Sequence, residues 1–167
     1  EACNGFYDAL PNVVAGYMDE INKLSGRSYK PFNYYGAPDA ERVIITMGSS
    51  AGCIRETVEY LLKKGEKVGF IDVHLYRPFS AKYFFDQLPK TVKIITVGDR
   101  TKEPGAAGEP LYEDVASVIK ESGKDIKVLA CRFGLGSKDY TPAQVIAQFE
   151  NMNKAEPMNH YTVGIND

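Results

Sequence analysis

The sequence has few cysteines and histidines, and they lie too far apart for the common metal sites. Its cysteines, Cys3, Cys53 and Cys131, form no Cys-x-x-Cys pair. This scattered set argues against a disulfide framework and suits a reducing cytoplasm. It also argues against an iron–sulfur cluster, whose thiolate ligands usually arrive in closely spaced groups. Because His74 and His160 are the only histidines, a histidine-based metal site is not expected either.

Long apolar runs and an excess of one charge are also missing. No apolar stretch approaches the roughly 20 residues that a transmembrane helix needs, and the residues at the start of the chain do not lead us to expect a signal peptide. The chain has 20 Lys and Arg against 22 Asp and Glu, so its net charge is only −2. This near-balance gives no electrostatic reason to expect a nucleic-acid or membrane partner. The composition, 44% hydrophobic and 25% charged, is instead that of a globular domain with a packed core.

Short β-branched and apolar runs predict four buried strands, at residues 43–47, 68–73, 92–97 and 126–131. Such near-continuous runs are typical of parallel strands that are covered on both faces. Apolar residues at helical spacing follow each of them, in residues 54–64, 83–88, 111–119 and 145–152. The alternation predicts an α/β fold, with a parallel sheet, right-handed crossovers and helices on both faces.

Helix signals are clearest at the two ends of this pattern. Thr141 as N-cap, Pro142 at the first helical position and Gln144 completing a capping box predict the start of the last helix. Before the first strand, apolar spacing predicts an additional helix over about residues 11–25, which Pro11 begins or kinks.

The chain is expected to form a single domain over residues 1–150. Periodicity ends after that, so residues 151–167 are expected to be a linker or an extension towards a further domain. Because the first residue is Glu rather than Met, we expect the natural protein to extend in both directions.

Small residues in the first strand–helix loop make it a candidate anion site. Gly48, Ser49, Ser50 and Gly52 expose backbone N–H groups at a helix N-terminus, where the helix dipole favours negative charge. The loop is neither a dinucleotide-binding nor a P-loop motif. We favour the alternative of a tight turn in which Ser49 or Ser50 caps the helix.

Charged residues at other strand ends are candidates for an interface. Asp99, Arg100, Lys102 and Glu103 open a long glycine-rich loop after the third predicted strand, where ligands bind in open parallel sheets. Their alternating signs favour ion pairs across a domain interface over a small-molecule site. Arg77, between two aromatic residues, is able to clamp a carboxylate or phosphate, but we expect a salt bridge within or between domains. No pairing of nucleophile and base predicts catalysis.

Segments along nearly the whole chain carry a resemblance to one family, and they lie at residues 24–44, 47–49, 65–69, 75–79, 99–105, 108–112, 132–135 and 159–165. The most specific is Asp-Arg-Thr-Lys-Glu-Pro-Gly at 99–105. Together they resemble the second domain of pyruvate:ferredoxin (flavodoxin) oxidoreductases. The resemblance implies a three-layer α/β/α sandwich with a mainly parallel, mixed sheet, like the carboxyl-terminal domain of transketolases. The antiparallel edge strand of such a sheet has no assigned place among the four predicted strands.

The resemblance also implies a function for the parent protein. These cytoplasmic enzymes oxidatively decarboxylate pyruvate with coenzyme A to acetyl-CoA and CO₂ and reduce ferredoxin or flavodoxin in anaerobic metabolism. They use thiamine diphosphate, Mg²⁺ and 4Fe–4S clusters, which other domains hold. The resemblance therefore implies a non-catalytic structural and assembly domain that binds no cofactor itself. Its partners are the other domains of the same polypeptide and the parent homodimer, and ferredoxin or flavodoxin binds through other domains. A small anion-binding module, or the equivalent domain of another 2-oxoacid:ferredoxin oxidoreductase, stays open as an alternative.

Overall fold

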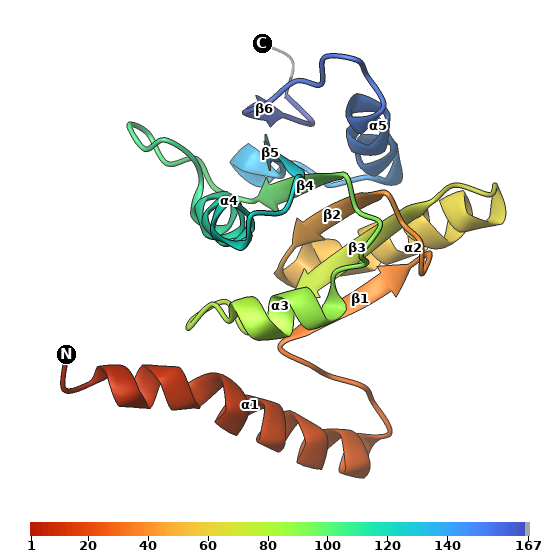
Figure 1. The fold of residues 1–167 in the computed structure, drawn as a ribbon. Coiled ribbons are helices and arrows are strands. Elements are labelled where there is room, and N and C mark those ends of the chain that lie inside the picture. Colours follow the sequence, from red (N-terminus) through yellow and green to blue (C-terminus); the bar gives the residue numbers. More distant parts are fainter. Residues whose placement is uncertain (166–167) are drawn as a thin grey trace.

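Helices cover both faces of a six-stranded sheet in the computed structural model, which describes residues 1–165 (Figure 1). The strands are β1 (Phe32–Gly36), β2 (Arg42–Thr46), β3 (Val68–Val73), β4 (Ile94–Asp99), β5 (Lys127–Arg132) and β6 (Tyr161–Thr162). The helices are α1 (Asn4–Ser25), α2 (Ala51–Lys63), α3 (Ala81–Gln87), α4 (Pro110–Ser122) and α5 (Pro142–Met152), with short 3-10 turns at Gly48–Ser50 and Leu135–Ser137. No helix within the described range has the length and apolar character needed to cross a membrane.

The sheet is mixed and mainly parallel. Its strand order is β1-β3-β2-β4-β5-β6, and β1 is antiparallel to β3 while the other pairs are parallel. The four predicted strands are β2 to β5, so the expected α/β fold is confirmed. The two edge strands were not predicted, because Phe-Asn-Tyr-Tyr-Gly in β1 has no β-branched residue and β6 has only two residues.

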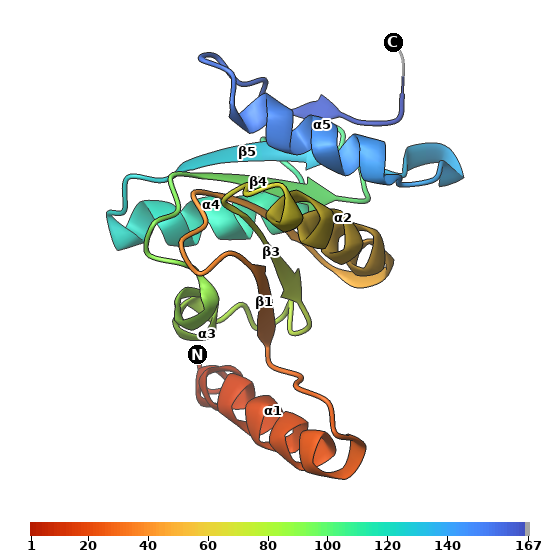
Figure 2. The same cartoon turned by 90° about the vertical axis from the view of Figure 1, so that its right-hand side faces the viewer.

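Side chains alternate between two cores, one on each face of the sheet. Val43 and Ile45 of β2 face the core that α3 and α4 cover, whereas Ile44 faces the core under α2 and α5. Figure 2 shows these layers from the side, with α2 and α5 in front of the sheet. Buried on both faces, the central strands needed apolar residues at nearly every position, which explains the continuous runs in the sequence.

Helix α1 begins earlier than expected and lies apart from the layered body (Figure 1). It starts at Asn4 and runs through Pro11, which is the one residue of α1 that is buried. Proline removes one backbone donor but does not have to end a helix, so the expected start at residue 11 is corrected. Gly26, at φ 68°, closes the helix in the left-handed conformation.

The segment after α5 joins the sheet. Tyr161–Thr162 pairs with β5, and the Asn159 side chain accepts a hydrogen bond from the Ala130 backbone N–H at 2.7 Å. Part of the stretch expected to be a linker or extension therefore belongs to the domain. At the start of α5, Thr141 is the N-cap and Pro142 follows it, but the capping box is absent because the Thr141 side chain makes no capping hydrogen bond.

Candidate interface at the carboxyl ends of the strands

The loops that follow β2, β4 and β5 meet at Arg100, the first residue after β4. Its guanidinium donates to the Ser49 hydroxyl at 3.4 Å. It also lies against Gly134, where a Cβ atom would come within 2.9 Å of the Arg100 Nε atom. Gly134 has φ 62°, so both its backbone and its neighbour disfavour a side chain there. Arg100 thereby brings together two predicted site regions, the loop with Ser49 and the loop that begins after Asp99.

A cavity of about 170 Å³ opens beside Arg100, and it is lined by Ser49, Ser50, Cys53, Arg100, Phe133, Ser137, Lys138, Asp139 and Tyr140. Gly48–Ser50 forms a 3-10 turn ahead of α2, and no serine side chain caps that helix. The buried Ser50 hydroxyl instead bonds to the Thr46 hydroxyl at 2.8 Å. The expected serine cap is therefore corrected, whereas the anion site stays a prediction.

Asp99 holds the start of α4 rather than facing solvent. Its two carboxylate oxygens accept hydrogen bonds from the backbone N–H groups of Leu111 and Tyr112, at 3.0 and 3.1 Å. Burial raises the pKa of the Asp99 carboxyl, and the two backbone donors oppose this rise. This carboxylate, predicted to serve an interface, satisfies the N-terminus of a helix in its own domain.

Arg132, the last residue of β5, is the centre of a buried charge network. It forms an ion pair with Glu109 at 3.0 Å, and their side chains are only 13% and 3% exposed. Its other nitrogens donate to the Thr162 hydroxyl at 3.1 Å and to the His160 carbonyl at 2.6 Å. Arg132 thus joins the N-cap of α4 to the edge strand β6. Because 23 residues separate Arg132 from Glu109, no local sequence pattern predicted the pair. The one signal in the sequence was an Arg at the end of an apolar strand, which indicates a charge that needs a partner.

Residues 102–107, here called the 102–107 loop, project away from the body next to α4 (Figure 1). Every residue in this loop is exposed. Within residues 1–165, Lys102 and Glu103 take part in no ion pair with another side chain. The loop also borders a cavity of about 270 Å³ that reaches Glu109, Arg132 and His160. The two predicted interface charges that remain free therefore lie on one projecting loop.

Arg77 is engaged inside the domain. It forms an ion pair with Asp114 of α4, and its guanidinium lies 4.1 Å from the centre of the Tyr76 ring. Such a cation–π contact adds an attraction to that of the ion pair. Arg77 therefore ties the loop after β3 to α4.

Comparison with known proteins gives the family of this domain. Residues 40–145 match the family model of the pyruvate:ferredoxin oxidoreductase core domain II. The chain belongs to this family. It is 56% identical over 167 residues to the pyruvate:ferredoxin oxidoreductase of Moorella thermoacetica and 53% identical to the pyruvate-flavodoxin oxidoreductase of Enterobacter agglomerans. All of this chain is covered in both cases, but it spans only 14% of each relative.

A solved structure with the same fold is the 2-oxoglutarate:ferredoxin oxidoreductase from Magnetococcus marinus. It matches with a TM-score of 0.53 and 20% identity, over 78% of this chain and 21% of that one. The likeness supports the α/β architecture of this core domain II, and the family resemblance drawn from the sequence is confirmed.

Cys131 and His74 of this core domain II are both engaged within the domain. Cys131 is buried, and burial raises its pKa to about 12, so the thiol stays protonated. His74 contacts the Lys30 carbonyl at 2.9 Å and Asp72 at 3.2 Å, and the Asp72 hydrogen bond raises the pKa of His74. Within residues 1–165, no three His, Cys, Asp or Glu side chains group so as to hold a metal ion.

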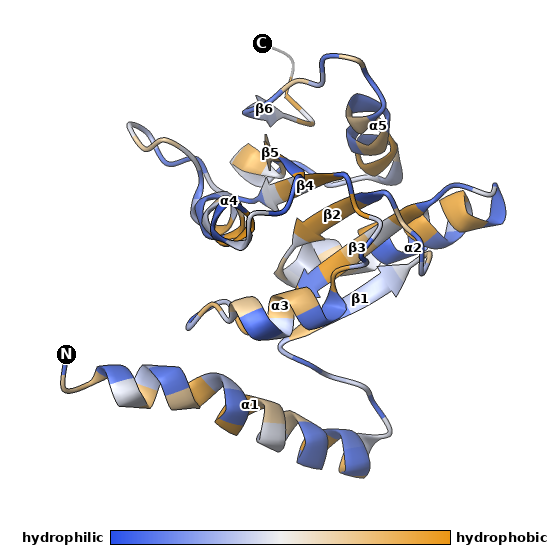
Figure 3. Ribbon diagram, viewed as in Figure 1, coloured by the Kyte–Doolittle hydropathy of each residue, from blue (hydrophilic) through white to orange (hydrophobic). Residues whose placement is uncertain are grey.

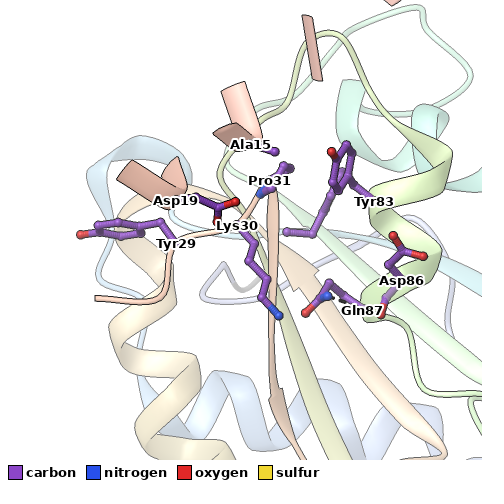
Figure 4. A pocket seen from close by; sticks show the side chains of 9 residues that line it. Ala15, Asp19, Tyr29, Lys30, Pro31, Tyr83, Asp86 and Gln87 are labelled. Carbon is purple, nitrogen blue, oxygen red and sulfur yellow. Dashed lines mark hydrogen bonds between the residues drawn. The ribbon is translucent and has the colours of Figure 1, made fainter. Parts of the chain in front are cut away.

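A cleft of about 260 Å³, lined by both polar and apolar side chains, lies between part of α1 and the body (Figure 4). Asp19 of α1 lines one wall, and Tyr83, Asp86 and Gln87 of α3 line the other. The Tyr83 hydroxyl donates to Asn12 of α1 at 2.9 Å. Contact between α1 and α3 in this core domain II therefore includes a hydrogen bond beside this cleft.

Proposed function

We propose that this chain is a non-catalytic structural and assembly domain of a pyruvate:ferredoxin or pyruvate:flavodoxin oxidoreductase. The parent enzyme would convert pyruvate and coenzyme A to acetyl-CoA and CO₂ in the cytoplasm and pass the electrons to ferredoxin or flavodoxin. The observation that carries the proposal is the division of charges at the carboxyl ends of the strands. Asp99, Glu109 and Arg132 hold the domain's own loops, whereas Lys102 and Glu103 project on the 102–107 loop.

An open parallel sheet usually offers free polar groups to a ligand at this edge. Here Asp99 accepts two backbone hydrogen bonds, Arg132 is paired with Glu109, and Arg77 is paired with Asp114. Groups already satisfied in this way are costly to redirect towards a substrate. The charges that are paired within the domain therefore favour a rigid structural role. The charges on the projecting 102–107 loop favour contact with another domain.

The thiols of this chain do not fit an iron–sulfur cluster. Cys3 precedes α1, Cys53 is on α2 and Cys131 is on β5, whereas the thiolates of a cluster usually come from closely spaced cysteines. Within residues 1–165 no metal-binding group of side chains forms either. We propose that the clusters, thiamine diphosphate, Mg²⁺ and coenzyme A of the parent enzyme are held by its other domains, and we derive no chemical step in this chain.

The experiment compares two charge swaps in the full-length parent polypeptide. Lys102→Glu with Glu103→Lys changes the 102–107 loop, and Lys120→Glu with Glu121→Lys is the matched control at the exposed end of α4. We expect the loop swap to lower the yield of assembled homodimer and of pyruvate-dependent acceptor reduction, with the control near wild type. Normal assembly and activity in the loop swap, or pyruvate turnover by residues 1–167 alone, would refute the proposal.

The cavity beside Arg100 supports a second candidate function, the binding of a small anion. Arg100 and Lys138 supply positive charge to it, opposed by Asp139, and about 170 Å³ accommodates a phosphate-sized group. Titration calorimetry with inorganic phosphate or coenzyme A tests this candidate, and Ser49→Ala with Ser50→Ala localises the site. Absence of heat at saturating ligand would exclude it.

A further inference from the structure

An apolar stripe runs along the solvent-facing side of α1. Its members recur every three or four residues and are between 38% and 90% exposed: Phe6, Tyr7, Leu10, Val13, Tyr17, Ile21 and Leu24. This spacing places them on one side of a helix of 22 residues, about 33 Å long at 1.5 Å per residue. Figure 3 shows hydrophobic residues recurring along the whole of α1.

The stripe is distinct from the surface by which α1 contacts the body. Pro11 is buried, Val14 and Met18 are half-buried, and Asn22 exchanges hydrogen bonds with the Tyr29 backbone at 2.7 and 2.8 Å. At 100° per residue these positions lie on average more than 90° around the helix from the stripe. These contacts place one side of α1 toward the body and leave the stripe uncovered.

The stripe is larger than the apolar patches that soluble proteins normally expose. The exposed fractions of its side chains correspond to on the order of 800 Å², when an aromatic side chain counts for about 200 Å². The largest patch of an ordinary monomer is about 300–600 Å². One partner in a standard interface contributes about 800 Å². The stripe thus has the size of one side of a stable interface.

We infer that the stripe docks against an apolar, basic-rimmed surface in the part of the parent polypeptide outside this chain. This inference rests on the proposed function and names the element that makes the contact. The relatives leave ample chain for such a partner, because this chain spans 14% of their length. The charge of α1 favours a partner other than a second copy of α1. Helix α1 carries Asp8, Asp19 and Glu20 against Lys23, so two copies side by side would repel each other.

Hydroxyl-radical footprinting of the full-length polypeptide tests the inference directly. Tyr17 is 64% exposed in this chain, so a cover that leaves under a tenth of it exposed lowers its oxidation rate at least about sixfold relative to the rate expected at 64% exposure, with urea-unfolded protein as the reference for full exposure. Phe6, which is 80% exposed, should be protected in parallel. Oxidation of both at the rates of exposed side chains would overturn the inference.

A matched pair of variants keeps the test independent of folding. Val13→Asp with Tyr17→Asp places two charges on the stripe, and Ala9→Asp with Gly16→Asp places two at exposed positions off it. In the full-length polypeptide we expect only the stripe variant to lose protection at Phe6. Equal protection in both would contradict the inference, even if the wild-type side chains were shielded.

Two further results separate the possible failures. Disulfide-linked dimers of a full-length Tyr17→Cys variant would show that a second copy of α1 covers the stripe, which overturns the choice of partner. If α1 is unprotected but the 102–107 loop swap still impairs assembly, only the present inference fails. If α1 is unprotected and the 102–107 loop swap leaves assembly unchanged, both the present inference and the proposed function fail.

Discussion

Replacing Arg132 by Met removes one partner of a buried ion pair and leaves the other in place. Glu109, 3% exposed, would then keep a charge with no cation beside it, and the Thr162 hydroxyl and the His160 carbonyl would lose their donor. Breaking a buried pair in this way costs about 3–5 kcal/mol. A domain of ordinary stability has about 5–15 kcal/mol in total, so the loss is a large share of it.

Urea unfolding of residues 1–167 measures this loss. The chain has no tryptophan, so far-ultraviolet circular dichroism is the appropriate signal. With a slope of about 2 kcal/mol per molar urea, the midpoint should fall by about 2 M. Lys127→Met, an exposed cation on the same strand, is the control and should change the unfolding free energy by less than about 0.5 kcal/mol.

The double variant Arg132→Met with Glu109→Met distinguishes a stranded charge from lost packing. Removal of both charges should recover at least half of the lost stability, because buried pairs are replaced by apolar residues at little net cost. A loss under about 1 kcal/mol in the single variant, or a double variant no more stable than the single one, would show that Arg132 does not compensate a buried charge on Glu109.

Three other perturbations test the same structure in residues 1–167. Asp99→Ala should lower the unfolding free energy by about 1–2 kcal/mol in urea, because it leaves backbone donors of α4 unsatisfied; a neutral result would contradict its capping role. The pKa of His74 is raised by Asp72, so the stability that this pair supplies is fully present below pH 6.5 and lost as pH rises through the raised pKa. Asp72→Asn should therefore destabilise the domain more at pH 6 than at pH 8.5, and an equal effect at both would exclude the linkage. With an aromatic disulfide reagent, Cys3 should react at once and Cys131 only on unfolding, since burial raises the pKa of Cys131 to about 12; rapid labelling of Cys131 in the native state would show that its strand opens.

Central features of the fold were predictable because they are local and strongly patterned. The strands β2 to β5 are covered on both faces, so each is a continuous apolar run in the sequence. The edge strand β1 escaped prediction because one of its sides is open and its Asn and Tyr residues are not typical of a buried strand. The start of α1 was placed too late because Pro11 was treated as a boundary.

The candidate interface was predictable only in its position. Asp99 and Arg100 were selected because they follow a strand, yet one side chain turns inward to α4 and the other bridges to Ser49. Neither direction is encoded by neighbouring residues, since both partners come from distant parts of the chain. The pair of Arg132 and Glu109 depends in the same way on the register of β4 and β5.

A structure of the full-length parent polypeptide at side-chain resolution would show whether residues 1–167 serve as a non-catalytic assembly domain. We expect the 102–107 loop and the apolar stripe of α1 both to lie buried against other parts of the polypeptide, with pyruvate chemistry located outside residues 1–167. A map in which both elements face solvent, or in which this domain contributes side chains to the thiamine diphosphate site, would contradict this expectation.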